Sequence, residues 1–405
     1  MADNKDKKVL NVPHLRFPEF CGEWEETTLG KISEITKGSG ISKDQLSEQG
    51  SPCILYGELY TKYKSEIIDE VYSRTELDSS SLVKSKANDV IIPCSGETAI
   101  DISTARCVPF NNILLGGDLN IIRLNQDDGG FFAYQLNGAR KKDIARVAQG
   151  VSVVHLYGEN LKHIRVYHPV VEEQKKITRL LSLIDERIAT QNKIIEDLKK
   201  LKSAISKYLF ARKDLLETTI CLSNIATLKN GYAFQSGKYN ALGKWKILTI
   251  TNVPGERYIN DEDCNCIINL PNDIQDHQVL KEGDILISLT GNVGRVSLCK
   301  NGNYLLNQRV GLLQLAKNVN QEFLYQILSS QRFENSMIAC GQGAAQMNIG
   351  KGDVENYVLP YSSNGNNILW VAKILHSYDE CIINELRRLT LFTMQKQYLL
   401  TQMFI

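Results

Sequence analysis

The sequence predicts an α+β protein with two globular mixed α/β domains, each followed by a long helix. Three observations lead to this prediction. The chain of 405 residues repeats one pattern after about 190 residues, each copy begins with short apolar runs between turn residues, and each copy ends in a long heptad pattern. Repeats of solenoid proteins are much shorter, at roughly 20–50 residues. The repetition therefore indicates duplication of a whole domain together with its helix.

Six matches in the same order support the duplication, and the shift between the copies stays between 191 and 195 residues. Each match is weak by itself, but a nearly constant shift is hard to obtain by chance. The matched pairs are Leu29–Gly38 with Leu222–Gly231, Asp89–Gly96 with Asp284–Gly291, Ile113–Leu124 with Tyr304–Leu315, Phe132–Gln135 with Phe323–Gln326, Gln149–Gly150 with Gln342–Gly343, and Asp185–Glu186 with Asp379–Glu380.

The first part of each copy, about residues 25–168 and 218–362, contains short runs of β-forming residues. Gly, Asn and Asp separate these runs, as expected for strands that are joined by loops. The clearest runs are Cys53–Tyr56, Asp89–Pro93, Asn120–Leu124, Ile247–Ile250 and Asp284–Leu289.

The second part of each copy is predicted to be one long helix, from about Glu172 to Leu209 and from about Asn367 to Gln402. Polar residues interrupt the apolar heptads at Gln191 and Lys202, and neither stretch contains Pro or Gly. A helix of about 38 residues spans roughly 55–60 Å. The recurring apolar residues are Leu181, Ile184, Ile188, Ile195, Leu198, Ile205 and Leu209 in the first copy, and Leu375, Tyr378, Ile382, Leu389 and Phe392 in the second.

These patterns divide the chain into five expected segments. They are an N-terminal segment at 1–24, a first globular domain at 25–171, a central helix at 172–212, a second globular domain at 213–365 and a C-terminal helix at 366–405.

Composition is that of an ordinary globular protein, with 43% hydrophobic and 23% charged residues. The net charge of +1 argues against a general polyanion binder, although it leaves room for local basic grooves. The ten cysteines form no disulfide or zinc framework, so we expect reduced thiols. No apolar run approaches the ~20 residues that span a bilayer, and the start has no signal core. We therefore expect a cytoplasmic protein without membrane association.

Local motifs resemble those of the specificity subunits of type I restriction-modification enzymes. Val12–Phe20, followed by Trp24, is similar to the N-terminal signature of that family, and Glu172–Ile177 is similar to the start of its central helix. The second copy departs from this pattern, because Asn366–Trp370 replaces the Glu-Glu-Gln stretch. The heptads nevertheless continue, and the resemblance covers essentially the whole chain.

The resemblance implies two target-recognition domains and two helices that pack antiparallel in a coiled-coil-like arrangement, with pseudo-twofold symmetry between the duplicated halves. It also implies that each domain reads one half of an asymmetric site in double-stranded DNA. Two modification (methyltransferase) subunits would dock alongside the helices, and restriction (endonuclease/translocase) subunits would join them. The expected partner-binding residues are Ile177, Leu181, Ile184, Ile188, Ile195, Leu198, Leu375, Ile382, Leu389 and Phe392.

No motif in the chain predicts catalysis. There is no Pro-Pro, so the Asn/Asp-Pro-Pro-aromatic motif of DNA methyltransferases is absent. Gly341–Gln346 begins like a dinucleotide-binding loop but lacks the third glycine, and no H-E-x-x-H metal motif occurs. We expect no catalytic or metal-binding residue and no cofactor in this chain. S-adenosylmethionine, ATP and magnesium are expected on the partner subunits.

Three loop-like stretches in each copy carry side chains that are suited to DNA. Arg and Lys pair with guanine, Asn and Gln with adenine, and Ser and Thr with several bases, while glycine lets a backbone approach phosphate closely. Ordinary turns are the alternative for each residue, and Ser152 and Val154 could instead be buried. The expected DNA-binding residues are Lys37, Ser39, Ser95, Glu97, Thr98, Arg106, Gln149, Ser152 and His155 in the first copy, and Lys229, Asn230, Thr290, Asn292, Arg295, Gln342, Gln346 and Asn348 in the second.

Two other functions remain open at this point. The chain could be an interaction scaffold that joins two partner subunits through its helices without binding DNA, or a DNA-binding protein that acts alone. The neutral net charge and these loops together suggest a modest affinity for DNA without partners.

Overall fold

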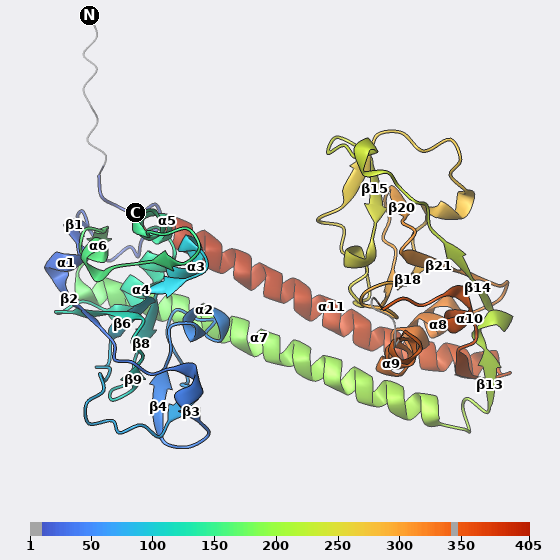
Figure 1. The fold of residues 1–405 in the computed structure, drawn as a ribbon, viewed down its shortest axis with the longest axis horizontal. Helices are drawn as coiled ribbons and strands as arrows, with labels where there is room; N and C mark the ends of the chain where they lie inside the picture. Colours follow the sequence, from blue (N-terminus) through green and yellow to red (C-terminus); the bar gives the residue numbers. More distant parts are fainter. Residues whose placement is uncertain (1–9, 342–346) are drawn as a thin grey trace, which may run out of the picture. The chain divides into compact units, whose positions relative to one another are not determined.

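The computed structural model describes residues 10–341 and 347–405, which form two compact units. The first unit contains the chain up to Asn192 together with Arg388–Ile405, and the second contains Lys193–Arg387. Each unit therefore combines one globular domain with a part of both long helices. In Figure 1 the strands of the first unit run from blue to green, and those of the second from yellow-green to orange.

A four-stranded antiparallel sheet forms the centre of the first unit, in the order β2-β10-β6-β8. Its residues alternate between two cores. Val90 and Ile92 enter a core that contains Phe131, whereas Ile91 enters another that contains Leu59. The continuous apolar run at 90–93 is explained by burial of both faces of the sheet. The strands are β2 (Ser33–Lys37), β6 (Asp89–Pro93), β8 (Arg106–Val108) and β10 (Leu119–Leu124).

The second unit repeats this sheet in the order β14-β21-β18-β19. Ile285 and Ile287 enter one core, and Leu286 enters the other, as in the first unit. The duplication predicted from the sequence thus corresponds to one sheet that is built twice. The strands are β14 (Ala226–Asn230), β18 (Ile285–Ser288), β19 (Val296–Leu298) and β21 (Val310–Leu315).

Each unit also contains a second four-stranded sheet with one parallel pair, in the orders β3-β5-β4-β9 and β16-β15-β20-β17. The strands of the second sheets are β3 (Leu46–Ser47), β4 (Ser51–Ile54), β5 (Ser73–Thr75) and β9 (Leu114–Leu115) in the first unit, and β15 (Trp245–Leu248), β16 (Asn265–Ile267), β17 (Val279–Leu280) and β20 (Tyr304–Leu306) in the second.

Each of the five strands expected from the sequence overlaps an observed strand of one of these four sheets.

Short strand pairs and helices complete the units. The pairs are β1 (Glu25–Thr28) with β12 (Arg165–His168), β7 (Ser95–Gly96) with β11 (Val154–His155), and β13 (Thr218–Cys221) with β22 (Val358–Tyr361). The helices are α1 (Leu29–Ile32), α2 (Glu58–Thr61), α3 (Ala99–Ile102), α4 (Gly129–Asn137), α5 (Lys141–Val147) and α6 (Gly158–Lys162) in the first unit, and α8 (Gln321–Leu328), α9 (Gln331–Cys340) and α10 (Lys351–Glu355) in the second.

Both predicted long helices are confirmed. α7 (Val171–Ala211) has 41 residues and α11 (Gly365–Gln402) has 38. The helices pack antiparallel, because Asp185 of α7 pairs with Lys396 of α11 in the first unit, while Lys202 of α7 pairs with Asp379 of α11 in the second. The α+β architecture with two mixed domains and two long helices is therefore as predicted.

Two properties bear on the environment of the chain. All ten cysteines lie within the described residues and are free. In the part of the chain that the structure describes, no helix is long and apolar enough to cross a membrane.

Candidate nucleic-acid interface

The second and third predicted loops of the first unit lie side by side. Strand β7 of the second loop pairs antiparallel with β11 of the third, so Ser95 lies opposite His155. Gln149 N donates to His155 O at 2.8 Å, and His155 N donates back to Gln149 O at 2.7 Å. Gly150 has a φ of +117°, which glycine adopts without strain and which closes the hairpin. Backbone pairing thus brings residues about 60 positions apart to one edge.

The same two loops meet in the second unit. Thr290 and Asn348 form an antiparallel bridge, and Thr290 Oγ1 donates to Asn348 Oδ1 at 3.2 Å. Gly291 N also donates to Met347 O at 2.9 Å. The pairing of the second loop with the third is therefore a shared feature of both units.

The first loop reaches the same edge through a turn that the sequence analysis missed. In the first unit Gly38 N donates to Leu119 O at 3.0 Å, while Cys94 N donates to Asp118 O at 2.7 Å. Ser95 Oγ donates to Asp118 Oδ2 at 3.1 Å. The turn before β10 therefore touches the first loop on one side and the second loop on the other.

The equivalent turn in the second unit adds two exposed side chains, Gln308 and Arg309. Tyr232 N donates to Leu306 O at 2.8 Å, and Leu289 N donates to Arg309 O at 3.0 Å. A signal for these residues existed in the sequence, because the turn lies inside the matched segments Ile113–Leu124 and Tyr304–Leu315. Its polar residues stand between two apolar runs, as loop residues do.

Glycine is required in the first loop for a reason other than the expected one. A Cβ atom at Gly38 would lie 2.0 Å from Gly116 O, and one at Gly231 would lie 2.2 Å from Asn307 O. The close approach at these two glycines is therefore to the chain's own backbone, and not to phosphate.

A cavity adjoins this edge in each unit. The cavity of the first unit measures about 860 Å³ and is lined by Gly40, Tyr56, Tyr60, Lys62 and Asp118, among others. The cavity of the second unit measures about 440 Å³, and its lining includes Tyr232, Phe234, Gln235, Lys238 and Asn272. Each cavity begins directly after the first loop and combines aromatic rings with polar groups, which suits contacts with bases and sugars.

Most of the predicted DNA-binding side chains are accessible at this edge. Gln342 and Gln346 lie outside the described residues. The exposed residues are Lys37, Glu97, Thr98, Gln149, Ser152 and His155 in the first unit, and Asn230, Asn292 and Asn348 in the second. The half-buried residues are Ser39, Lys229, Thr290 and Arg295.

Arg106 is a wrong prediction. Its side chain is buried, and its guanidinium donates to the carbonyl oxygens of Leu59 at 3.1 Å and of Tyr63 at 2.8 Å. Burial lowers the pKa of Arg106 below its ordinary value. A guanidinium whose donors are directed into the protein cannot contact DNA.

Several other residues of the loops have structural roles. Ser95 is buried on Asp118, which removes it from the set of base-reading candidates. Ser39 Oγ accepts from Val83 N at 2.8 Å, and Thr98 Oγ1 caps α3 by accepting from Asp101 N at 3.1 Å. Of the two residues for which burial was the alternative, Val154 is buried in the core and Ser152 is exposed.

The expected partner-binding residues of the helices require a correction as well. The half-buried members are Ile188, Leu198, Leu389 and Phe392. Six of the ten are buried within the chain's own cores, where no partner can reach them: Ile177, Leu181, Ile184, Ile195, Leu375 and Ile382. Heptad spacing identified the residues that pack within the chain, because internal packing and partner docking use the same apolar periodicity.

Other apolar side chains of the helices are exposed. Ile194, Leu201 and Tyr208 of α7 are 40%, 47% and 61% exposed, and their spacing of seven residues places them on one face. Leu391, Met394 and Tyr398 of α11 are 63%, 63% and 59% exposed. The first three residues belong to the second unit, and the last three to the first.

Comparisons with known proteins agree with this architecture. The specificity subunit of the type I restriction enzyme MjaVIII from Methanocaldococcus jannaschii is 24% identical over 359 residues, which cover 82% of this chain and 80% of that protein. Among solved structures, the S subunit of a type I restriction-modification system from M. genitalium matches with a TM-score of 0.63 and 18% identity, over 97% of this chain and 99% of that one.

A second solved chain comes from a study of complex assembly and conformational transition in the type I system. It matches with a TM-score of 0.56 and 14% identity, over 93% of this chain and 96% of that one. The sequence model of the type I restriction modification DNA specificity domain matches twice, at residues 22–200 and 217–390. Since the two matches cover both copies of the duplication, this chain belongs to the family of type I restriction-modification specificity subunits.

Proposed function

We propose that this chain recognises an asymmetric two-part site in double-stranded DNA, with one half-site for each recognition domain. The observation that carries the proposal is the paired edge that is repeated in both units. In each unit the second and third loops are joined by backbone hydrogen bonds, next to the turn that also holds the first loop. A rigid edge with exposed polar side chains is the kind of surface that reads bases in a groove.

The two edges carry different chemical groups. The first presents the Gln149 amide, the Ser152 hydroxyl and the His155 imidazole, whereas the second presents the amides of Asn292 and Asn348. Amides pair well with adenine, and hydroxyl groups tolerate several bases. Different donors and acceptors on the same scaffold support recognition of two different half-sites.

We further propose that the chain transfers no methyl group and cleaves no DNA, and that it acts in the cytoplasm. The missing methyltransferase and nucleotide-binding motifs support the absence of catalysis, and the ten free cysteines support the cytoplasmic location. The purified chain with S-adenosylmethionine should leave DNA unmethylated. Methyl incorporation that remains with the chain through further purification would contradict it.

The methyltransferase and restriction subunits are positioned, in this proposal, by the long helices. The exposed apolar side chains of Ile194, Leu201 and Tyr208, and of Leu391, Met394 and Tyr398, supply surface of the kind that partner helices bury. The buried heptad residues hold the two helices together and so shape this surface indirectly.

Methylation mapping tests the proposed function most directly. A host strain that expresses this chain with its methyltransferase subunits should gain one interrupted, asymmetric methylation motif that is absent without this chain. Filter binding at 50 and 200 mM salt provides the second measurement, since phosphate contacts make log K fall linearly with log salt. A scaffold that binds no DNA would give partner binding, no new motif and no contribution of this chain to the salt slope.

A further inference from the structure

A buried carboxylate joins the recognition domain to both long helices in each unit. The two residues are Asp185 on α7 and Asp379 on α11, which are 9% and 5% exposed. They occupy equivalent positions in the duplication, 194 residues apart. A buried charge is costly unless partners compensate it, so the contacts of these two residues report what holds each unit together.

The first junction consists of Asp185 and its partners in the first unit. Asp185 accepts a hydrogen bond from Tyr134 Oη on α4 at 2.7 Å and one from Ser65 Oγ at 3.1 Å. Lys396 Nζ on α11 lies 2.6 Å from Asp185 Oδ1 and also pairs with Glu66. One carboxylate thus holds the globular domain, α7 and α11 together.

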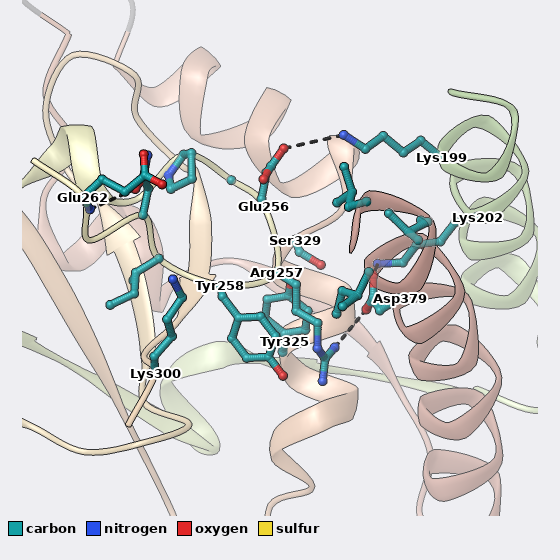
Figure 2. Close-up of a pocket in the computed structure, with 17 residues that line it drawn as sticks. Lys199, Lys202, Glu256, Arg257, Tyr258, Glu262, Lys300, Tyr325, Ser329 and Asp379 are labelled. Carbon is teal, nitrogen blue, oxygen red and sulfur yellow. Dashed lines mark hydrogen bonds and ion pairs between the residues drawn. The ribbon is translucent and has the colours of Figure 1, made fainter. Parts of the chain in front are cut away.

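The second junction consists of Asp379 and its partners in the second unit, of which Figure 2 shows Lys202 and Arg257. Lys202 of α7 pairs with Asp379, and Arg257 Nη1 donates to Asp379 Oδ2 at 2.9 Å. Gln326 of α8 donates to the same oxygen at 2.5 Å. Arg257 also donates to both carboxylate oxygens of Glu322, at 2.9 and 2.6 Å. Its planar guanidinium therefore holds Glu322 through two hydrogen bonds while it also donates to Asp379, a geometry that a single ammonium group does not reproduce.

The two junctions follow one plan with different chemistry. Lys202 and Lys396 are also 194 residues apart, and each pairs with the aspartate of the other helix. Tyr134 and Gln326 come from neighbouring positions of the matched segments Phe132–Gln135 and Phe323–Gln326. In both units the carboxylate is satisfied only when the domain and the two helices meet in one geometry.

We propose that Asp185 and Asp379 are positioning residues, each of which fixes the orientation of its recognition domain on the helix pair and so restricts the spacing between half-sites that the protein accepts. This inference rests on the proposed function as a reader of a two-part DNA site. Hydrogen bonds to a buried carboxylate are directional and strong, whereas apolar packing alone permits small rotations. A domain that can rotate would tolerate a spacer that is one base pair too long or too short.

The test uses the full chain in complex with its methyltransferase subunits and the motif found by methylation mapping. Three duplexes carry the natural spacer or a spacer changed by plus or minus one base pair. The measured quantity is the ratio of the methylation rate on the natural spacer to that on the altered ones. Asp185→Asn and Asp379→Asn should each lower this ratio at least fivefold. The controls Glu186→Gln and Glu380→Gln remove the same charge from the next residue and should leave the ratio unchanged.

Two milder variants, which should still fold, keep the proposal testable if the aspartate variants do not fold. Tyr134→Phe removes one hydrogen bond from the first junction. Arg257→Lys keeps the charge of the second junction but loses the two-bond pairing with Glu322 that accompanies the bond to Asp379. Both should lower the ratio about twofold to threefold with soluble, intact complexes. If all four junction variants reduce the three rates by one common factor, their role is structural and the inference is wrong. If the wild-type complex yields no two-part motif, the proposed function itself fails.

Discussion

The two recognition domains share one scaffold but attach to the helices by different chemistry. Both contain the same antiparallel sheet order, and both pair the second loop with the third. In the first junction the hydroxyl groups of a tyrosine and a serine donate to the aspartate, whereas in the second the donors are an arginine guanidinium and a glutamine amide. The residue that corresponds to Glu322 in the first domain is the buried Phe131. Duplication thus kept the sheet and the position of the aspartate while its surroundings diverged.

This difference between the two domains shows which parts of a recognition domain can change independently. Neighbouring residues of the central sheet enter two different cores, so a change in the strand order or register would disturb both. The exposed loop side chains and the partners of the aspartate change without altering the strand order. Selection for a new half-site can therefore act on the edge while the scaffold persists.

The largest effect on the DNA target is expected when a second copy of the N-terminal half takes the place of the C-terminal half. We expect a fragment of residues 1–212 to form a homodimer that, with methyltransferase subunits, directs methylation of an interrupted palindrome. Lys202 of one copy would meet Asp185 of the other, as Lys202 meets Asp379 and Lys396 meets Asp185 in the full chain. Twofold symmetry would make both domains read the same half-site. Ultracentrifugation followed by methylation mapping measures both parts.

The missing end of α11 is the main difficulty for this fragment, because Leu399, Met403 and Phe404 belong to the core of the first unit. The second copy can supply Ile205, Leu209 and Phe210, which stand 194 residues earlier. The control Lys202→Glu places like charges at the new pair and should make the fragment monomeric. A dimer that methylates an asymmetric site would show that the two halves are not equivalent modules.

The two long helices can also be compared as docking sites for the methyltransferase subunits. The apolar patch at Ile194, Leu201 and Tyr208 is not repeated in α11, where the equivalent residues are Arg388, Gln395 and Gln402. We therefore expect each helix patch to hold a different methyltransferase copy. The double variant Ile194→Glu with Leu201→Glu should lower the number of methyltransferase subunits in the complex from two to one, as measured by native mass spectrometry. The double variant Leu391→Glu with Met394→Glu should remove the other subunit.

The matched control for docking is Lys193→Glu with Lys200→Glu, which changes exposed charges on α7 outside the apolar patch. This control should retain both methyltransferase copies. Loss of both copies from either apolar double variant would mean that the patches act as one site.

Single substitutions at the two edges should separate the half-sites. Gln149→Ala should relax selectivity only in the first half-site, and Asn292→Ala only in the second. Loss of one good base contact costs about 1–3 kcal/mol, or about 5-fold to 150-fold in discrimination. Methylation rates on duplexes with single base changes provide the measurement. Asn301→Ala, an exposed change in the turn between β19 and β20, should alter neither half-site.

The smallest effect concerns acid sensitivity, which should be greater in α8 of the second domain than in α4 of the first. Burial raises the pKa of Glu322, but hydrogen bonds from Arg257 and Gln326 outweigh it and leave the pKa below its ordinary value of 4.5. A carboxylate with a lowered folded pKa stabilises the fold above pH ~4.5 and loses that contribution as the pH falls further. We expect Glu322→Gln to weaken the acid dependence of unfolding in the second domain.

Hydrogen exchange read separately over α4 and α8 at pH 7 and pH 4 measures this difference. At the corresponding position the first domain has Phe131, which does not titrate, so α4 should be the less acid-sensitive helix. A change of about 1 kcal/mol corresponds to roughly 2–4 °C in Tm for a domain of this size. An equal response of α4 and α8, or an unchanged response in Glu322→Gln, would contradict the prediction.

The sequence by itself determined the features that have a local period or a long-range repeat. The heptads at Leu181–Leu209 and Leu375–Phe392 identified both long helices, because apolar spacing along a helix is a property of neighbouring residues. The constant shift between matched segments identified the two copies of the sheet. The run Asp89–Pro93 was predicted with the bounds that the structure gives it.

Only the tertiary structure decided which of the predicted residues can act. Arg106 looked like a DNA contact, but its guanidinium is held by carbonyl oxygens of residues more than 40 positions away. Lys202 looked like an interruption of the heptads, yet it is the partner of Asp379. Burial and ion pairing depend on contacts between distant segments, whereas a sequence period reports only near neighbours. Lys202, which interrupts the heptads, therefore forms an ion pair in the second unit, and Lys396 with Asp185 forms the equivalent pair in the first.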